Sequence, residues 1–468
     1  MSQTVNALTD LVKALEAGGY DAAPSTLVQG AALQIEDLSP VMNNVTYDST
    51  HIKLQKMLKT ESCKSTLAQF DRQLSYGQFG AAAQYEGNVG PEDTSDYVRV
   101  TVPMAFYSKV RRVTIVSTMV ATVDGKKADE REAANAAITM AGEIEFDSFR
   151  GMDDFSNGGV FDGNPVAAEK AMPNIHGLGL QVRQSDSQIN ARDLMFSEYG
   201  SDDTVVLSGG GTTLTQGLVE DAALRSTLAF GNASKLVVDP VVLSAYNKIT
   251  YGKERILLGG SPQDATGGDL RKQWVSGGTV SVEASQFLRG KAKPARPRQG
   301  SPASPASVTP ADGAAGATGL SGNYWYFATA VSEGGESLPT NAAAVVAVTL
   351  NNYATVTIAN PASGTWRYFN VYRSAAGGTL ASARFIGKVV AANAATTVFY
   401  DYGNKAPGYV TGYLLQEDSC TMKELAPYSR LKLAVVDLTQ PEANFTFKTL
   451  AVIKPRQNVL IDNLKGTI

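Results

Sequence analysis

The sequence predicts an α+β protein of several domains, with an all-β domain inserted into it. Three observations lead to this prediction. A helical pattern of small apolar residues covers residues 127–149, strand and helix patterns alternate over residues 235–249, and residues 323–402 contain strand patterns almost without interruption. Strands that alternate with helices indicate mixed layers, whereas many short strands in a row indicate a sandwich, so two kinds of domain are expected.

The composition narrows the class of protein. The 468 residues include 41 Lys and Arg and 45 Asp and Glu, and only 18% are charged, against about 25% in ordinary soluble domains. The 43% hydrophobic content excludes a mainly disordered chain. The balanced charge gives no general electrostatic reason to bind nucleic acid. A surface with so few charges indicates that much of it meets other protein.

The length predicts about three domains, because a domain usually takes roughly 100–200 residues. The first residues show no basic region followed by an apolar stretch, so we expect no secretory signal. No apolar run approaches the roughly 18 residues that a membrane-spanning helix needs. We therefore expect the chain to be made and folded in a cytoplasm.

Residues 1–60 are predicted to form an arm with short helices. Apolar residues recur every three to four positions from Val5 to Leu15, and a glycine pair ends the pattern. The stretch 51–58 is half apolar and half basic, as a docking helix would be. We expect this N-terminal arm to reach a neighbouring subunit.

Residues 97–122 are predicted to form a long hairpin-like loop. Valines alternate with polar residues in its first half, and a second β-branched run covers residues 113–120. No adjacent sequence offers a layer to cover this apolar run, and uncovered apolar strands usually mark an interface. Between the two runs lie three basic residues, Lys109, Arg111 and Arg112. We predict that they contact acidic surface on a neighbouring subunit.

The clearest helix is predicted over residues 127–149. Acidic residues lie in its first turn, where they favour the positive end of the helix dipole. Ala133, Ala137, Met140 and Ile144 lie on one face. At about 1.5 Å per residue the helix would span roughly 30–35 Å, which suits a helix that lies across a sheet.

Further along the chain, local signals predict a helix, a strand and a second helix. Thr213 with Gln216 has the pattern of a capping box at a helix start. Residues 235–238 are predicted to form a short buried strand. Asp239 followed by Pro240 is typical of an N-cap and a first helical position.

The composition changes abruptly after residue 289. Residues 296–322 are rich in Pro, Ala, Gly and Ser, which is typical of a linker. Residues 323–404 carry short strand patterns separated by turn residues, and are predicted to form a sandwich. The sequence pattern changes again over residues 405–468, where strands are expected at 431–436 and 445–453. The sandwich should therefore fold alone, and its deletion should leave the rest of the chain able to assemble.

Few side chains in the sequence could carry chemistry. Neither His51 nor His176 has a metal-ligating partner nearby, and no nucleophile, histidine and acid grouping can be found. Cys63 and Cys420 are expected to be buried small hydrophobic residues. We therefore predict no catalytic, cofactor or metal site, and no enzyme.

Three polar segments have two interpretations each. The glycine-rich segment 208–213 lacks the lysine and spacing of a phosphate-binding loop, so a flexible loop is favoured over an anion site. Asp153 and Asp154 begin an acidic stretch that lacks the alternation of a calcium loop, so a solvated turn is favoured. The basic stretch 291–298 is interleaved with prolines, and a solvated hinge is favoured over nucleic-acid contact.

The order of these elements resembles the major capsid proteins of tailed bacteriophages with the Hong Kong 97 fold. The resemblance rests on the runs ANAAITMAGEIE (134–145) and SKLVVDPVVL (234–243), and on the closing strands 431–436 and 445–453. It covers about residues 30–295 and 416–468. It implies an N-arm at 1–60 and a capsid core at 61–295. Within that core, the extended loop would be at about 97–122, the spine helix at about 127–149 and the axial domain within about 200–290. Residues 405–468 would return to the core as peripheral-domain strands.

The inserted segment is similar to a fibronectin type III or immunoglobulin-like domain. The similarity rests on YWYFATAVS (324–332) followed by GES (335–337), and on FNVYRS (369–374), FIG (385–387) and FYDYG (399–403). Such a module, at 323–404 here, often decorates phage structural proteins.

These resemblances imply a major capsid protein that assembles into the icosahedral head shell around phage DNA. The implied partners are further copies in hexamers and pentamers, the portal and other head proteins, and DNA on the inner face without sequence specificity. No cofactor or membrane is implied, and the implied location is the virion after assembly in the host cytoplasm. The alternative is another virion or cell-surface structural protein, such as a tail or adhesion component, whose sandwich binds a receptor or glycan. Such a protein should lack the long arm and the spine helix.

Overall fold

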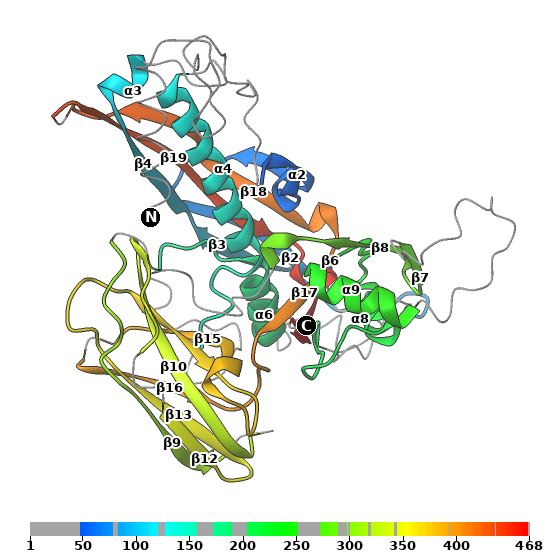
Figure 1. Ribbon diagram of the computed structural model, residues 1–468. Coiled ribbons are helices and arrows are strands. Elements are labelled where there is room, and N and C mark those ends of the chain that lie inside the picture. The colour runs from blue at the N-terminus through cyan, green and yellow to red at the C-terminus, as the bar shows by residue number, and fades with distance from the viewer. Residues whose placement is uncertain are drawn as a thin grey trace, which may run out of the picture.

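The fold combines two mixed β-sheets with helices and a separate all-β unit, as the computed structural model in Figure 1 shows. The structure describes residues 47–77, 83–119, 127–156, 172–189, 204–250, 272–288, 297, 300–316, 320–340, 344–392, 394–435 and 437–466. Most of the expected N-terminal arm, including the helix predicted at 5–15, lies outside the described residues.

The first sheet has four strands in the order β1-β18-β19-β4. Their bounds are Lys59–Ser62 for β1, Cys420–Lys432 for β18, Thr439–Val452 for β19 and Ala105–Thr114 for β4. Helix α4, Ala128–Phe149, lies across one face of this sheet, where the sequence predicts a helix at 127–149 (Figure 1). The Tyr107 hydroxyl on β4 donates to Asp147 Oδ2 on α4 at 2.7 Å.

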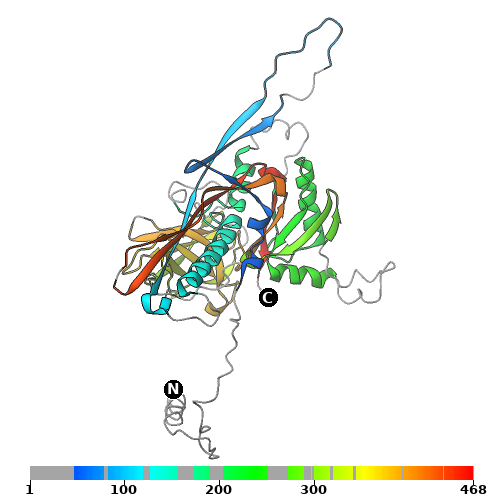
Figure 2. The same cartoon turned by 90° about the horizontal axis from the view of Figure 1, so that it is seen from above.

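The hairpin expected at 97–122 is not formed. Strand β3, Asp96–Pro103, instead pairs antiparallel with β2, Leu67–Ser75, while β4 pairs with β19. The strand that pairs with β4 thus comes from more than 300 residues later in the chain. One face of β4 is covered by α4, which follows closely in sequence. Figure 2 shows the β2–β3 hairpin extending away from the rest of the molecule.

The second half of the same segment is helical rather than extended. Helix α3 covers Ile115–Met119 within the run predicted as a strand. The Ser117 hydroxyl donates to the Thr114 carbonyl at 2.7 Å, and the Ser117 amide donates to Thr114 Oγ1 at 3.3 Å. Such local Ser and Thr hydrogen bonds favour a helix start over a continuing strand.

The second sheet has six strands in the order β5-β20-β17-β6-β8-β7. Their bounds are Val206–Ser208, Val459–Lys465, Tyr409–Leu415, Lys235–Val238, Gly278–Ala284 and Lys272–Val275, in that order. The helices of this part are α6 (Leu178–Ile189), α8 (Gln216–Leu228) and α9 (Pro240–Thr250). Every residue of β17 is buried, because this strand lies in the interior of the sheet and both its faces are covered.

Of two helix starts predicted in this region, one agrees with its predicted N-cap residue and the other does not. Asp239 Oδ1 accepts from the Val241 amide at 2.6 Å, the N-cap that the Asp-Pro pair predicts. Helix α8 is capped by Thr215, whose Oγ1 accepts from the Leu218 amide at 3.3 Å, rather than by the predicted Thr213. The apolar residues of both sheets and their helices form one hydrophobic core, which includes Phe149 of α4.

The all-β unit contains eight strands in two sheets that share a hydrophobic core. One sheet has the order β11-β10-β14-β15, with β12 also on β10, and the other has the order β16-β13-β9. The strands are β9 (Val308–Ala315), β10 (Gly322–Ser332), β11 (Gly335–Glu336), β12 (Ala344–Val348), β13 (Asn352–Ala359), β14 (Tyr368–Arg373), β15 (Arg384–Val390) and β16 (Thr396–Asp401).

The boundary predicted at residue 323 is wrong, because the segment assigned to a linker at 296–322 contains β9. Val308 and Leu320 lie in the core that the two sheets share, and Pro305 forms a bridge with Pro361. Strand β9 is at the edge of its sheet and carries Pro310 and Gly313. These residues hide the strand pattern in the sequence, and an edge strand tolerates them.

The chain enters the all-β unit after β8 and leaves it before β17, two strands of the six-stranded sheet. The unit is thus an insertion within that sheet (Figure 1). We refer to residues 300–404 as the insert. The chain after it contributes to both sheets, since β17 and β20 join the six-stranded sheet and β18 and β19 join the four-stranded one. The strand expected at 431–436 is wrong for most of its length, because β18 begins at Cys420 and ends at Lys432, and residues 433–435 are not in a strand.

Short helical turns complete the described chain. They are η2 (Ser49–His51), α2 (Leu54–Met57), η4 (Gln286–Leu288), η5 (Leu380–Ser382), η6 (Glu417–Ser419) and η7 (Pro455–Gln457). The buried carboxylate of Glu145 on α4 accepts from the amides of Lys53, Leu54 and Gln55 at 3.0, 2.7 and 3.1 Å. Because a carboxylate satisfies the free amides of a helix start, the predicted docking stretch 51–58 is held against α4.

Candidate functional site

The β2–β3 hairpin is the first candidate surface for binding another protein. Its distal part exposes large side chains, with Tyr76 83%, Tyr85 87% and Val89 95% exposed. Gathered apolar and aromatic exposure of this kind usually marks an interface. The hairpin was missed in the sequence because its two strands are separated by about 20 residues rich in polar and turn residues, which conceal the pairing.

The base of this hairpin is joined firmly to the four-stranded sheet. Arg72 donates to the Val452 carbonyl at 2.5 Å, and its guanidinium lies 5.2 Å from the centre of the Phe70 ring. Burial lowers the pKa of Arg72 to about 10, which still leaves the guanidinium charged at neutral pH. An ion pair between Asp71 and Arg99, at 2.8 Å, joins the two strands. The β2–β3 hairpin is therefore anchored at its base, and its distal end projects from the molecule.

The face of the four-stranded sheet that points away from α4 is the second candidate surface. The register places Val110, Ala443 and Leu431 side by side on it, and Phe106 beside Phe447. Phe106 is 53% and Val110 61% exposed. The rings of Phe106 and Phe447 are 4.9 Å apart in an edge-to-face arrangement. We call this surface the outer sheet face.

The three basic residues predicted to contact a neighbour do not share one surface. Lys109 and Arg111 point toward α4, where Lys109 Nζ lies 2.5 Å from Glu143 Oε1 and an Arg111 nitrogen lies 3.6 Å from Glu132 Oε2. Arg112 is exposed on the outer sheet face. Alternation along β4 separates them, because successive side chains of a strand point to opposite faces.

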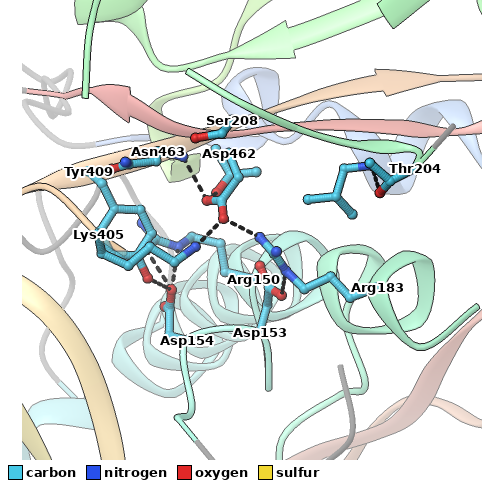
Figure 3. A network of polar contacts seen from close by, with 12 residues as sticks. Arg150, Asp153, Asp154, Arg183, Thr204, Ser208, Lys405, Tyr409, Asp462 and Asn463 are labelled. Atoms are coloured by element: carbon cyan, nitrogen blue, oxygen red, sulfur yellow. Dashed lines mark hydrogen bonds and ion pairs between the residues drawn. The ribbon is translucent and has the colours of Figure 1, made fainter. Parts of the chain in front are cut away.

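A buried polar cluster lies where the insert meets the rest of the chain (Figure 3). It contains charged or hydroxyl side chains from five parts of the chain: Arg150, Asp153, Asp154, Arg183, Lys388, Lys405, Tyr409 and Asp462. We call this cluster the polar junction. Each of its charged side chains is at most 10% exposed.

Asp154 is one of two carboxylates at the centre of the polar junction. Its Oδ1 accepts from Arg150 at 2.7 Å and from the Tyr409 hydroxyl at 2.9 Å, and its Oδ2 lies 3.6 Å from Lys388 Nζ of the insert. Burial opposes ionisation of this carboxyl, but the charges of Arg150 and Lys388 outweigh burial and lower its pKa. Asp154 is therefore a carboxylate held between cations.

Asp462 on β20 is the second carboxylate at the centre of the polar junction. Its Oδ2 lies 2.6 Å from an Arg183 nitrogen and forms an ion pair with Lys405, just after the insert, while its Oδ1 accepts from Thr411 at 3.1 Å. Burial opposes ionisation here too, yet Arg183 and Lys405 lower the pKa of Asp462. Arg183 also binds Asp153 at 2.5 Å, which links the two halves of the polar junction.

The solvated turn predicted at Asp153 and Asp154 is wrong, because both side chains are buried in ion pairs. The other residues of that acidic stretch, Asn157, Asp162 and Asn164, lie outside the described residues. One signal in the sequence was available, since Arg150 stands four residues before Asp154, the spacing of an ion pair on a helical turn. The remaining partners come from distant parts of the chain and leave no local pattern.

The other residues considered as candidate sites make structural contacts within the chain. His51 Nδ1 lies 3.0 Å from Asp48 Oδ1, and half-buried His176 precedes α6. In the glycine-rich segment 208–213, the amides of Gly209 and Gly211 donate to the carbonyls of Asp462 and Asn463 at 2.6 and 2.8 Å. These two amides are thus occupied by β20 rather than directed at an anion.

Searches for two other kinds of site found nothing within the described part of the chain. It contains no group of three or more histidine, cysteine or acidic side chains placed to hold a metal ion. No helix in the same residues combines the length and apolar character that crossing a membrane requires.

The two cysteines should differ in reactivity. Cys420 is buried and burial raises the pKa of its thiol to about 11, whereas Cys63 is half-buried. At pH 8 a pKa near 11 leaves about one thiol in a thousand ionised, and the thiolate is the reactive form. We expect a thiol reagent to modify Cys63 in the native protein and Cys420 only after unfolding. Mass spectrometry after labelling with and without denaturant checks this, and rapid native labelling of Cys420 would contradict the burial.

Comparisons with known proteins give one relative by sequence and several by structure. No protein-family model matches the chain. A protein of Enterococcus phage phiEF24C, provisionally named as its major capsid protein, is 23% identical over 465 residues, which cover 96% of this chain and 93% of that protein. Its name is that of a structural protein, in agreement with the expectation that the chain is not an enzyme.

The solved structures that resemble this chain share little of its sequence. The capsid of a native GTA particle has a TM-score of 0.46 at 10% identity and covers 95% of this chain and all of that one. The capsid of cyanophage P-SCSP1u has a TM-score of 0.43 at 8% identity, with 95% and 96% covered. A holo-SrpI encapsulin complex from Synechococcus elongatus PCC 7942 has a TM-score of 0.39 at 7% identity, with 92% and 93% covered.

Proposed function

We propose that this chain is the major capsid protein of a tailed phage and forms the shell of its head. The observation that supports this most is the similarity to the phage phiEF24C protein, which extends over nearly the whole of both chains. In this proposal the fold is of the Hong Kong 97 type, with α4 as the spine helix and the β2–β3 hairpin as the extended loop. The insert is an immunoglobulin or fibronectin type III-like domain exposed on the shell surface.

The geometry supports assembly from many copies. An isolated two-stranded hairpin is at best marginally stable in water, so a projecting β2–β3 hairpin needs a partner to cover it. The outer sheet face of another copy has the apolar character to bury Tyr85 and Val89. Symmetric copies could satisfy both surfaces at once, because each chain offers a hairpin and a face.

The proposal includes partners and a location. Copies would form the hexamers and pentamers of an icosahedral shell, in contact with the portal and other head proteins. DNA would lie on the inner face without sequence-specific contacts. The protein would assemble in the host cytoplasm and remain in the virion.

Negative-stain microscopy of the purified, expressed chain tests the proposed function. Closed shells or capsomers are expected. Tubes or monomers would instead favour a tail or adhesion component, in which the insert binds a receptor or glycan.

The basic residues of β4 allow a sharper test. We propose that Arg112, exposed on the outer sheet face, contacts acidic surface of a neighbouring subunit, whereas Lys109 and Arg111 hold α4 of their own subunit. Arg112→Glu should leave a folded subunit whose assembly is impaired, more so at low salt, where charge repulsion is least screened.

Arg111→Glu is the matched control for this variant. It should lower the stability of the subunit by about 0.5 kcal/mol or more, because it breaks a partly exposed pair with Glu132 and places two like charges together. Thermal unfolding and light scattering separate the two effects. Normal assembly of Arg112→Glu at every salt concentration would remove Arg112 from the interface.

A further inference from the structure

We infer that the polar junction determines the direction in which the insert is presented, so that the insert is one fixed body with the rest of the chain and not a tethered module. This inference concerns contacts within one chain and does not depend on the proposed function. It rests on three kinds of contact between the insert and its surroundings: apolar packing, backbone hydrogen bonds and buried ion pairs.

The apolar contacts bring the two parts together. On one side of the junction, Phe327, Tyr372 and Phe385 of the insert pack with Tyr409 of β17. On the other side, Phe155 packs edge-to-face on Tyr368 with ring centres 5.3 Å apart. Apolar burial is non-directional, so contacts of this kind favour association without selecting one orientation.

Backbone hydrogen bonds join the insert to its surroundings at two residues of β15, and at one of them the Gly408 amide donates to the Phe385 carbonyl at 2.8 Å. The Lys388 amide on β15 donates to the Asp154 carbonyl at 2.9 Å, and the Ser156 amide donates to the Lys388 carbonyl at 3.0 Å. The insert thereby continues into the backbone that follows α4. All of these hydrogen bonds are made by β15, so a rotation of the insert about this strand has to be prevented elsewhere.

The buried ion pairs supply that restraint at two separated points. Asp154 pairs with Lys388 of the insert. Asp462 pairs with Lys405 of the segment that follows the insert, and the Lys405 carbonyl accepts from Arg373 of the insert at 2.6 Å. The two carboxylates belong to different parts of the chain, the turn after α4 and strand β20, so both pairs can form in only one orientation. Any other orientation would leave buried charges without partners, which costs several kcal/mol per ion.

The cost of burying charges affects the orientation of the insert more than the strength of its attachment to the rest of the chain. Replacing a complete buried ionic group by apolar residues of similar volume is often neutral for stability, whereas removing one partner is strongly destabilising. The charges of the polar junction therefore contribute most to selecting one arrangement. Apolar packing then supplies most of the affinity between the insert and the remainder of the chain.

Distance measurements between spin labels test this inference. Labels at Thr309→Cys on β9 and Glu130→Cys on α4, both exposed, report the position of the insert. The two native cysteines are replaced by alanine, and labelled chains are diluted with unlabelled ones so that only distances within a chain are recorded. The unmodified junction should give a single narrow distance.

Two kinds of variant then distinguish a loss of fixed orientation of the insert from a loss of stability. Lys405→Met, which leaves Asp462 short of a cation, should shift the denaturant midpoint to lower concentration. The apolar set of Arg150→Met, Asp154→Leu, Lys388→Met and Tyr409→Phe should unfold cooperatively with its midpoint largely retained, but should lose the single distance. As a matched control, Asp71→Asn in the exposed pair with Arg99 should change neither reading.

The inference would be overturned by a broad distance distribution in the unmodified chain, or by a single narrow distance in the folded apolar set. If the apolar set fails to fold, Lys388→Met alone provides the decision. It removes the ion pair between the insert and Asp154, while Arg150 still pairs with that carboxylate. A broadened distance supports the inference, and an unchanged one contradicts it.

Discussion

Replacing the end of the β2–β3 hairpin, residues 76–95, with a two-residue Asn-Gly turn is expected to give a folded subunit that forms no shells. Apart from half-buried Gly77, the described residues of this segment are exposed, and none belongs to a hydrophobic core, so the subunit loses little by their removal. Surface changes of this kind usually alter stability by about 0.5 kcal/mol or less. The Asn-Gly pair suits a tight turn between antiparallel strands.

The loss of assembly follows from the apolar surface removed. Burying a large apolar side chain contributes about 1.5–3 kcal/mol, so Tyr76, Tyr85 and Val89 together would supply roughly 5 kcal/mol or more to each contact between copies. Electron microscopy and sedimentation measure assembly, and circular dichroism measures folding. Leu350→Ser, which removes an exposed apolar side chain from the insert, is the control and should assemble normally. Normal shells from the shortened hairpin would show that the hairpin is not an assembly element.

Deleting the insert, residues 300–404, and joining the ends with a short glycine linker is expected to leave a chain that aggregates or fails to fold. The deletion uncovers Met152, Phe155, Leu180 and Tyr409, which are buried beneath or beside the insert. At about 1.5–3 kcal/mol for each large apolar side chain, the loss is on the order of 5–10 kcal/mol. This equals much of the roughly 5–15 kcal/mol that stabilises a typical domain.

The same deletion removes Lys388 and so leaves Asp154 with one cation fewer. Denaturant unfolding and size-exclusion chromatography measure the result. As a control, shortening only the exposed turn at 375–379 should leave both folding and solubility intact, because that turn contributes no side chain to the polar junction. A soluble, cooperatively folded deletion product that assembles would restore the interpretation of the insert as a removable module.

Local signals in the sequence were sufficient for α4, α8 and α9 and for the presence of the insert, whereas α3 lies in a run predicted as a strand and α6 was not predicted. Acidic residues at the start and small apolar residues on one face predict α4, and the Asp239-Pro240 pair predicts the start of α9. These features depend on neighbours within one or two turns, so the sequence contains all the information they need. The dense strand patterns after residue 323 likewise show an all-β unit, although Pro310 and Gly313 concealed its first strand.

The sequence by itself thus determined the α+β class, helices α4, α8 and α9, and an inserted all-β unit. Only the tertiary structure decided which strands pair, which faces are covered and which charges are buried. Strand β4 could have paired with β3, but it pairs with β19 from the other end of the chain. Asp154 and Asp462 could have been solvated, but packing brings Lys388 and Lys405 to them. Strand pairing and buried ion pairs join residues that are far apart in sequence, and nothing local to either partner specifies the other.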